Sequence, residues 1–138
     1  MRKFGITLLI LLTLTSCVSL SDKNQKSLSY YGIISGTVMY PNNLYFPARV
    51  RLEIALTSID SLTAEGKTIV SQSIRNPQRF PVNFILRYDS LDIRSSNQHF
   101  ITIELYQEGE EKAYLSTGRI SLDRLSGDDS IIAELRTF

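Results

Sequence analysis

The chain has one cysteine, Cys17, and it directly follows a short apolar segment at the N-terminus. Leu14 stands three residues before it, and two small residues, Thr15 and Ser16, lie between them. This spacing is that of a lipobox, in which a peptidase cuts before the cysteine and the thiol becomes a thioether that carries acyl chains. We therefore predict that the chain is cleaved between Ser16 and Cys17 and that Cys17 is lipidated.

The residues ahead of Cys17 have the composition of a signal peptide. Arg2 and Lys3 are basic, and residues 4–14 are almost wholly apolar. The apolar run is far shorter than the roughly 20 residues that a membrane-spanning helix needs. The alternatives are a membrane anchor, a helix of the folded domain and a plain secretory signal, and the last would leave an unpaired thiol in an oxidising compartment. We expect residues 1–16 to be a lipoprotein signal peptide.

The residues after Cys17 predict where the protein is held. One acyl chain, at about 0.8 kcal/mol per buried CH₂, anchors only reversibly, but a lipobox cysteine normally receives more than one. Val18 occupies the position at which Asp usually signals retention in the inner membrane, so the sequence resembles a signal for the outer membrane. Residues 19–29 are mostly polar without an apolar period, which is typical of a flexible tether. We expect residues 17–30 to be this acylated tether and the domain to face the periplasm.

The chain offers few residues for catalysis or metal binding. His99 is the sole histidine; a catalytic triad would have to use it, and we expect an ordinary polar residue at the start of a strand. Asp128 and Asp129 lack the loop pattern of a calcium site. Asp89 and Asp92 could be a general acid and base, but a solvated turn in which they accept hydrogen bonds from backbone amides is the favoured interpretation. We expect no enzyme, no metal and no cofactor.

Length and charge limit the remaining possibilities. Removing residues 1–16 from the 138 leaves 122, of which about 110 lie beyond the tether, enough for one domain. Removing Arg2 and Lys3 from the 15 basic residues leaves 13, against 14 acidic residues. This balance gives no indication of a nucleic-acid partner. Without a second cysteine the domain has no disulfide, so residues 31–138 must be held together by their core.

Alternation of apolar and polar residues dominates the domain and predicts strands. The pattern is clearest in residues 50–56, 79–87 and 99–106. Turn residues separate the runs. Weaker strand patterns occupy residues 32–40, 68–74, 113–121 and 131–137. Seven short strands predict an all-β fold, a single small β-sandwich of mostly antiparallel strands.

Further local features refine this picture. Residues 108–111, Glu-Gly-Glu-Glu, stand between two strands and predict a hairpin loop. Pro81 inside a strand pattern indicates an edge strand or a bulge, because proline has no N–H to donate. Residues 58–65 and 121–126 are the only segments that could hold a helical turn.

Aromatic residues gather around the turn at residues 41–43, Pro-Asn-Asn. Tyr40 precedes this turn, and Tyr45 and Phe46 follow it. Exposed aromatic side chains in a loop are typical anchors for a protein partner. The favoured interpretation is that they fold over one end of the sandwich as a plug. Tyr45 and Phe46 are our candidate partner-binding residues.

A longer pattern runs from about residue 33 to residue 115. Its parts are the opening Gly36-Thr37-Val38, residues 46–53 (FPARVRLE), residues 59–64 (IDSLTA) and residues 80–89 (FPVNFILRYD) followed by Ile93. This pattern resembles the YscW/ExsB-type pilotin lipoproteins of type III secretion and the wider YbaY-like lipoprotein group. After Ser116 the chain departs from many YbaY-like sequences, because residues 116–120 contain no proline.

The resemblance implies a β-sandwich lipoprotein that binds the C-terminal segment of a secretin subunit. The acyl chains would carry that complex to the outer membrane, where the secretin ring assembles. The edge near Pro81 and a groove lined by Tyr45 and Phe46 are the candidate docking surfaces. The alternatives are a general YbaY-like envelope lipoprotein without a secretin partner, and a lipoprotein that binds a lipid or small ligand between its sheets.

Overall fold

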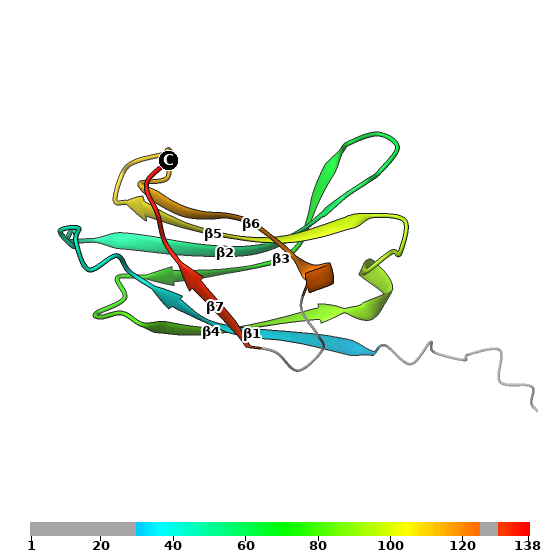
Figure 1. Cartoon of the computed structure of the whole chain (residues 1–138), viewed down its shortest axis with the longest axis horizontal. Helices are drawn as coiled ribbons and strands as arrows, with labels where there is room; N and C mark the ends of the chain where they lie inside the picture. Colours follow the sequence, from blue (N-terminus) through cyan, green and yellow to red (C-terminus); the bar gives the residue numbers. More distant parts are fainter. Residues whose placement is uncertain (1–29, 125–129) are drawn as a thin grey trace, which may run out of the picture.

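The computed structural model describes residues 30–124 and 130–138 (Figure 1). The predicted signal peptide, the Ser16–Cys17 cleavage site and nearly all of the tether lie outside the described residues, as do Asp128 and Asp129. The described chain forms seven strands: β1 (Tyr31–Met39), β2 (Val50–Ile59), β3 (Gly66–Arg75), β4 (Val82–Asp89), β5 (Gln98–Gln107), β6 (Leu115–Ser121) and β7 (Ile131–Glu134). Each of the seven predicted strands is confirmed.

The strands form two sheets that face each other (Figure 1). One has three strands in the order β4-β1-β7, and the other has four in the order β3-β2-β5-β6. All neighbouring strands pair antiparallel except β1 and β7, which are parallel. The predicted all-β sandwich of mostly antiparallel strands is confirmed.

The core lies between the sheets, where each strand turns its alternate residues inward. β2 and β5 are paired so that apolar residues stand opposite each other, as Leu52 and Leu105 do. Burying a large aliphatic side chain stabilises the fold by about 1.5–3 kcal/mol. The fully buried side chains of these two strands are Leu52, Ile54, Leu56, Ile101, Ile103 and Leu105. Across the interior they form one cluster with Ile34, Val38, Phe84 and Leu86 from β1 and β4, so side chains occupy the space that a lipid-carrying sandwich would need.

Two glycines of β1 make room for aromatic rings of β4. Gly32 pairs with Tyr88 and Gly36 pairs with Phe84 in the antiparallel register. A Cβ atom added at Gly36 would lie 2.6 Å from the Phe84 ring and 2.8 Å from the backbone oxygen of Ile131. The rings therefore lie over the backbone of β1 and fill the space that a side chain would otherwise take.

The two sides of the sandwich differ. On one side a bridge between Ser116 and Arg136 links the sheets, with both backbone N–H···O distances at 2.9 Å. On the other side lie β3 and β4, which are the edge strands of their sheets. Pro81 directly precedes β4, so the predicted edge is confirmed, although the strand begins at Val82 rather than at residue 79.

The short helical turns fall only partly where the sequence predicted them. A 3-10 turn at Leu122–Arg124 lies within the expected segment 121–126. In the expected segment 58–65, β2 continues to Ile59, and a single turn follows in which the backbone N–H of Ala64 donates to the carbonyl of Asp60 at 2.9 Å, the spacing of one α-helical turn. The Asp60 carboxylate also accepts hydrogen bonds from the backbone N–H groups of Leu62 and Thr63. A further 3-10 turn, which was not predicted, lies at Ser90–Asp92 after β4.

The loop at residues 108–111 is the predicted hairpin between β5 and β6. Gly109 adopts a φ of 84°, a left-handed conformation that glycine reaches without strain. The backbone N–H of Glu110 donates to the carbonyl of Gln107 at 3.1 Å and closes the turn.

Within residues 30–124 and 130–138, no helix has the length and apolar character required to cross a membrane.

Candidate partner-binding site

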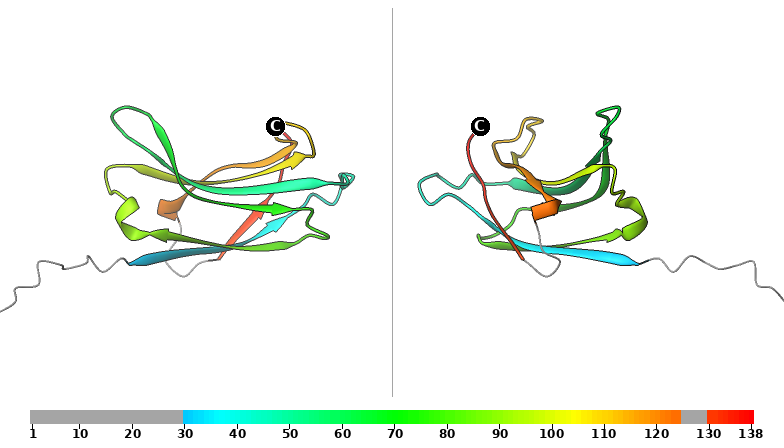
Figure 2. Two further views of the ribbon diagram at one scale, coloured as in Figure 1. Left: turned by 180° about the vertical axis from the view of Figure 1, so that it is seen from behind. Right: turned by 45° about the vertical axis from the view of Figure 1, so that its right-hand side comes forward.

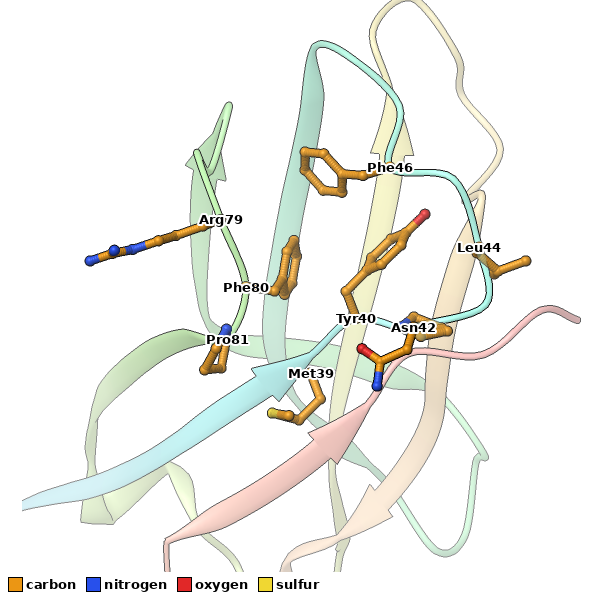
Figure 3. A pocket seen from close by; sticks show the side chains of 9 residues that line it. Met39, Tyr40, Asn42, Leu44, Phe46, Arg79, Phe80 and Pro81 are labelled. Atoms are coloured by element: carbon orange, nitrogen blue, oxygen red, sulfur yellow. The ribbon is translucent and has the colours of Figure 1, made fainter.

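A groove lies at the end of the sandwich opposite to the point where the chain enters β1 (Figures 1 and 3). It has a volume of about 380 Å³ and is here called the aromatic groove. Its walls come from the last residue of β1, the β1–β2 connection at residues 40–49 and the β3–β4 connection at residues 76–81. The lining residues are Met39, Tyr40, Pro41, Asn42, Leu44, Phe46, Arg79, Phe80 and Pro81.

Three aromatic rings form the centre of the groove. The ring centroids of Tyr40 and Phe46 are 5.2 Å apart, those of Tyr40 and Phe80 are 5.4 Å apart, and those of Phe46 and Phe80 are 5.7 Å apart. Two of the pairs meet edge to face, an arrangement that the ring quadrupoles favour. All three rings pack against the buried core. They form a rigid apolar floor.

The Tyr40 hydroxyl fixes the position of the following loop. It donates a hydrogen bond of 2.6 Å to the backbone carbonyl of Tyr45. Burial, together with the neighbouring Tyr114 hydroxyl, raises the pKa of the Tyr40 phenol to about 12. The phenol is therefore protonated at neutral pH and keeps its donor role.

The strand register explains why residues 40 sequence positions apart meet here. β1 and β4 are antiparallel with Val38 opposite Val82, and continuing that register by two residues brings Tyr40 beside Phe80. The β1–β2 connection then turns back at Pro41, whose carbonyl accepts from the N–H of Leu44 at 3.3 Å. This turn returns Phe46 to the other two rings.

The chemistry of the groove suits binding. Its side chains are mostly apolar, and Arg79 is the one charged residue among them. Arg79 is exposed and extends away from the three rings (Figure 3). No carboxylate, thiol or imidazole belongs to the lining. Such a groove can take up an apolar segment and pair with an acidic group beside it.

The structure gives different surroundings to Phe46 and Tyr45, the two candidate partner-binding residues. Phe46 lines the groove and also packs on the core, as the plug interpretation expects, and its role as a partner anchor stays a prediction. Tyr45 is 85% exposed, and it does not line the groove. Pro81 lines the same groove as Phe46, so the two predicted docking surfaces are one surface.

Tyr40, Phe80 and Arg79 are groove residues that sequence reasoning did not select. The alternation of residues 80–86 assigns Phe80 to the inward face of a strand, and Tyr40 was noted only as part of a local aromatic cluster. Tyr40 and Phe80 meet because β1 pairs with β4, and the sequence does not specify this pairing.

His99 lies at the start of a strand, as expected, but its side chain is buried. It is the second residue of β5 and is 3% exposed, because the alternation that buries Ile101 extends back to it. Its Nε2 atom makes no hydrogen bond to any described residue. It lies on β5 opposite Ser58, at the end of the sandwich away from the aromatic groove.

The predicted turn around Asp89 is confirmed. The Asp89 carboxylate accepts a hydrogen bond of 2.9 Å from the backbone N–H of Leu91 and caps the short turn that includes Asp92. In the described part of the chain, no group of three His, Cys, Asp or Glu side chains is arranged to hold a metal ion.

Comparison with known proteins gives a family match and a structural match. Residues 30–119 match the family model of the type III secretion system lipoprotein chaperone YscW. Among solved structures, the chain is similar to an alternative pilotin from the type II secretion system of Vibrio cholerae. That likeness has a TM-score of 0.61 at 18% sequence identity and covers 79% of this chain and all of the other. A search of curated proteins found no match. Since the family model spans more than half of the sequence, the chain belongs to the YscW family of type III secretion system lipoprotein chaperones.

Proposed function

We propose that this protein is a pilotin: an outer-membrane lipoprotein that binds a secretin subunit and promotes its targeting and assembly in type III secretion. The observation that carries the proposal is the family match, because residues 30–119 include every residue that lines the aromatic groove. The protein acts by binding, and no catalytic step is part of the proposal.

The aromatic groove is the docking site for the apolar C-terminal segment of the secretin. Such short segments bind as a helix in a groove or as a strand added to a sheet edge, and the groove adjoins the beginning of the edge strand β4. Tyr40, Phe46 and Phe80 supply the apolar floor. Arg79 pairs with an acidic group of the segment, the terminal carboxylate included.

The position of the groove suits a carrier protein. The chain enters β1 at one end of the sandwich, and the groove lies at the other (Figure 1). Acyl chains on Cys17 hold the first end to the outer membrane from the periplasmic side. The bound secretin segment therefore does not compete with the anchor for space.

The test is a titration of the mature chain with a synthetic peptide of the secretin's C-terminal segment. Met39→Glu places a charge on the groove wall, at a side chain that is 40% exposed, and Tyr45→Ala removes the exposed aromatic beside the groove. Each is expected to weaken binding by at least about tenfold, the size of a moderate anchor residue.

Leu62→Glu is the matched control. Leu62 is 96% exposed in the turn after β2, at the opposite end of the sandwich. This variant adds the same charge and should bind as the unmodified chain does. If Met39→Glu and Leu62→Glu bind the peptide with equal affinity, the docking site lies outside the groove. A chain that binds no secretin segment at all would favour a general envelope lipoprotein.

A further inference from the structure

The outer face of the three-stranded sheet exposes a set of large apolar side chains. β1 contributes Tyr31 and Ile33, which are 69% and 57% exposed, and β4 contributes Ile85, which is 61% exposed. Ile132, which is 81% exposed, extends the set to β7. We call these four residues the apolar face.

The register places these residues next to one another. Ile85 stands opposite Ser35 and therefore diagonal to Ile33 on the same side of the sheet. Ile132 stands opposite Thr37 across the parallel pair. Their inward neighbours, such as Ile34 and Ala133, are buried in the core, so alternation directs the apolar face outward. No described element covers this side of the sheet (Figure 2).

The outer face of the other sheet has a different character. It carries paired charges, such as Arg51 and Glu53 at 3.0 Å, and Arg119 lies over the Phe100 ring at 5.6 Å. The outward row of β1, by contrast, contains no charged residue between Tyr31 and Met39. On the three-stranded sheet the charged residues of the outward rows, Arg87 and Asp89 of β4 and Glu134 of β7, lie beside this uncharged row. The apolar stretch is therefore the row of β1 with Ile85 and Ile132 on either side of it.

The predicted anchor enters the domain beside the apolar face. Tyr30 and Tyr31 are the first described residues and are both about 70% exposed. Tyr30 is thirteen positions along the chain from Cys17, a length that spans at most roughly 45 Å. A domain held this close to a bilayer meets the lipid at a high effective concentration, so that a weak contact suffices.

The composition at this end is that of a membrane interface. Tyrosine is enriched at the boundary between water and lipid, where its ring lies among apolar groups and its hydroxyl in water. Arg87 is exposed directly opposite Ile33 on β4 and can reach a phosphate headgroup while its stem lies on apolar surface. Tyrosines, isoleucines and Arg87 share the part of the sheet nearest the anchor with Asp89, which stands opposite Tyr31 and whose carboxylate accepts from the N–H of Leu91.

We infer that the apolar face lies on the phospholipid surface of the membrane, so that the domain rests on the bilayer and is not merely tethered to it. The lipid-facing part is centred on Ile33 and Ile85, with Tyr31 and Arg87 at the headgroups. The inference rests on the acylation of Cys17 proposed above. It gives the three-stranded sheet a role beyond that of a scaffold, because this contact orients the aromatic groove relative to the membrane.

The absence of tryptophan from the sequence permits a direct test. Ile33→Trp and Ile85→Trp each place a single fluorescent reporter on the apolar face. Ser71→Trp is the matched control, because Ser71 is exposed on β3 with its side chain on the outer face of the other sheet. Acylated mature protein is reconstituted with phosphatidylethanolamine–phosphatidylglycerol vesicles whose lipids carry bromine in the upper acyl chain, at the depth of about 5–10 Å that interfacial segments reach.

The expected result is strong bromine quenching and a blue shift for both reporters on the apolar face, with neither for Ser71→Trp. Flotation of the vesicles is measured on the same samples. If the protein floats but all three reporters behave alike, the face does not lie on lipid and the inference is overturned while the anchor stands. If the acylated protein does not float, the anchor fails and the inference falls with it. A blue shift without vesicles that grows with protein concentration would assign the face to a second copy of the chain and overturn the inference.

Discussion

At the scale of single residues, Gly36 shows how closely β1 and β4 pack. The backbone at this position lies beneath the Phe84 ring and beside the backbone oxygen of Ile131. Gly36→Ala is expected to destabilise the domain by about 1–3 kcal/mol, as overpacking of a core does, because the backbone of β7 cannot yield as a side chain can. The free energy of unfolding in urea measures this cost.

Gly66→Ala is the control for this prediction. Its added Cβ would meet only the Thr57 methyl group, at an ordinary 3.8 Å. It should leave the free energy of unfolding unchanged or slightly raised, since alanine reduces the freedom of the unfolded chain. Equal effects of the two substitutions would show that the close approach at Gly36 is not the cause.

The residues of the candidate site were predictable only in part. The sequence identified Phe46 by its place after a turn of Pro and Asn residues, and the structure has it in the groove. It could not identify Tyr40 and Phe80 as partners, because their meeting depends on the register of β1 and β4. It also could not show that Tyr45 turns outward, since neighbouring loop residues follow no fixed alternation. The burial of His99 could have been predicted, because the alternation that buries Ile101 also assigns residue 99 to the inward face.

At the scale of elements, β7 and the residue after it close the sandwich. Leu135 is fully buried, and its N–H donates to the carbonyl of Met39 at 3.0 Å. Leu135→Ala should destabilise the domain by about 2–5 kcal/mol, since it leaves a cavity at the junction of the two sheets. Thermal or urea unfolding measures the loss.

Ile132→Ala provides the comparison within the same strand. Ile132 is 81% exposed, so its truncation should change the free energy of unfolding by no more than about 0.5 kcal/mol. A small effect of Leu135→Ala would mean that the C-terminal strand contributes little to the core.

The elements themselves were largely predictable from local patterns. Period-two alternation identified the strands, most clearly β2, β4 and β5, in which inward and outward residues alternate. β3 and β6 alternate less regularly. The pairing of β7 parallel to β1 was not predictable, since a four-residue strand carries no sign of its partner. The 3-10 turn at Ser90–Asp92 was not predictable as helical, because Asp residues favour any turn that lets them accept from backbone N–H groups; the turn itself and the capping role of Asp89 are as expected.

At the scale of the whole molecule, function divides between two ends. Cys17 is proposed to hold one end to the outer membrane, and the aromatic groove at the other is proposed to hold a secretin segment. The apolar face lies on one side of the β-sandwich that joins them. Each part can be removed by a single substitution that leaves the core intact, so their contributions are separable.

The most direct test of the central claim is the amount of secretin multimer in the outer-membrane fraction of cells. Four strains are compared: cells with the unmodified chain, cells without it, cells with Cys17→Ser and cells with Met39→Glu. We predict abundant multimers only with the unmodified chain, because Cys17→Ser removes the lipid anchor and Met39→Glu weakens binding of the secretin segment. Normal multimer abundance in cells that lack the chain altogether would contradict the account.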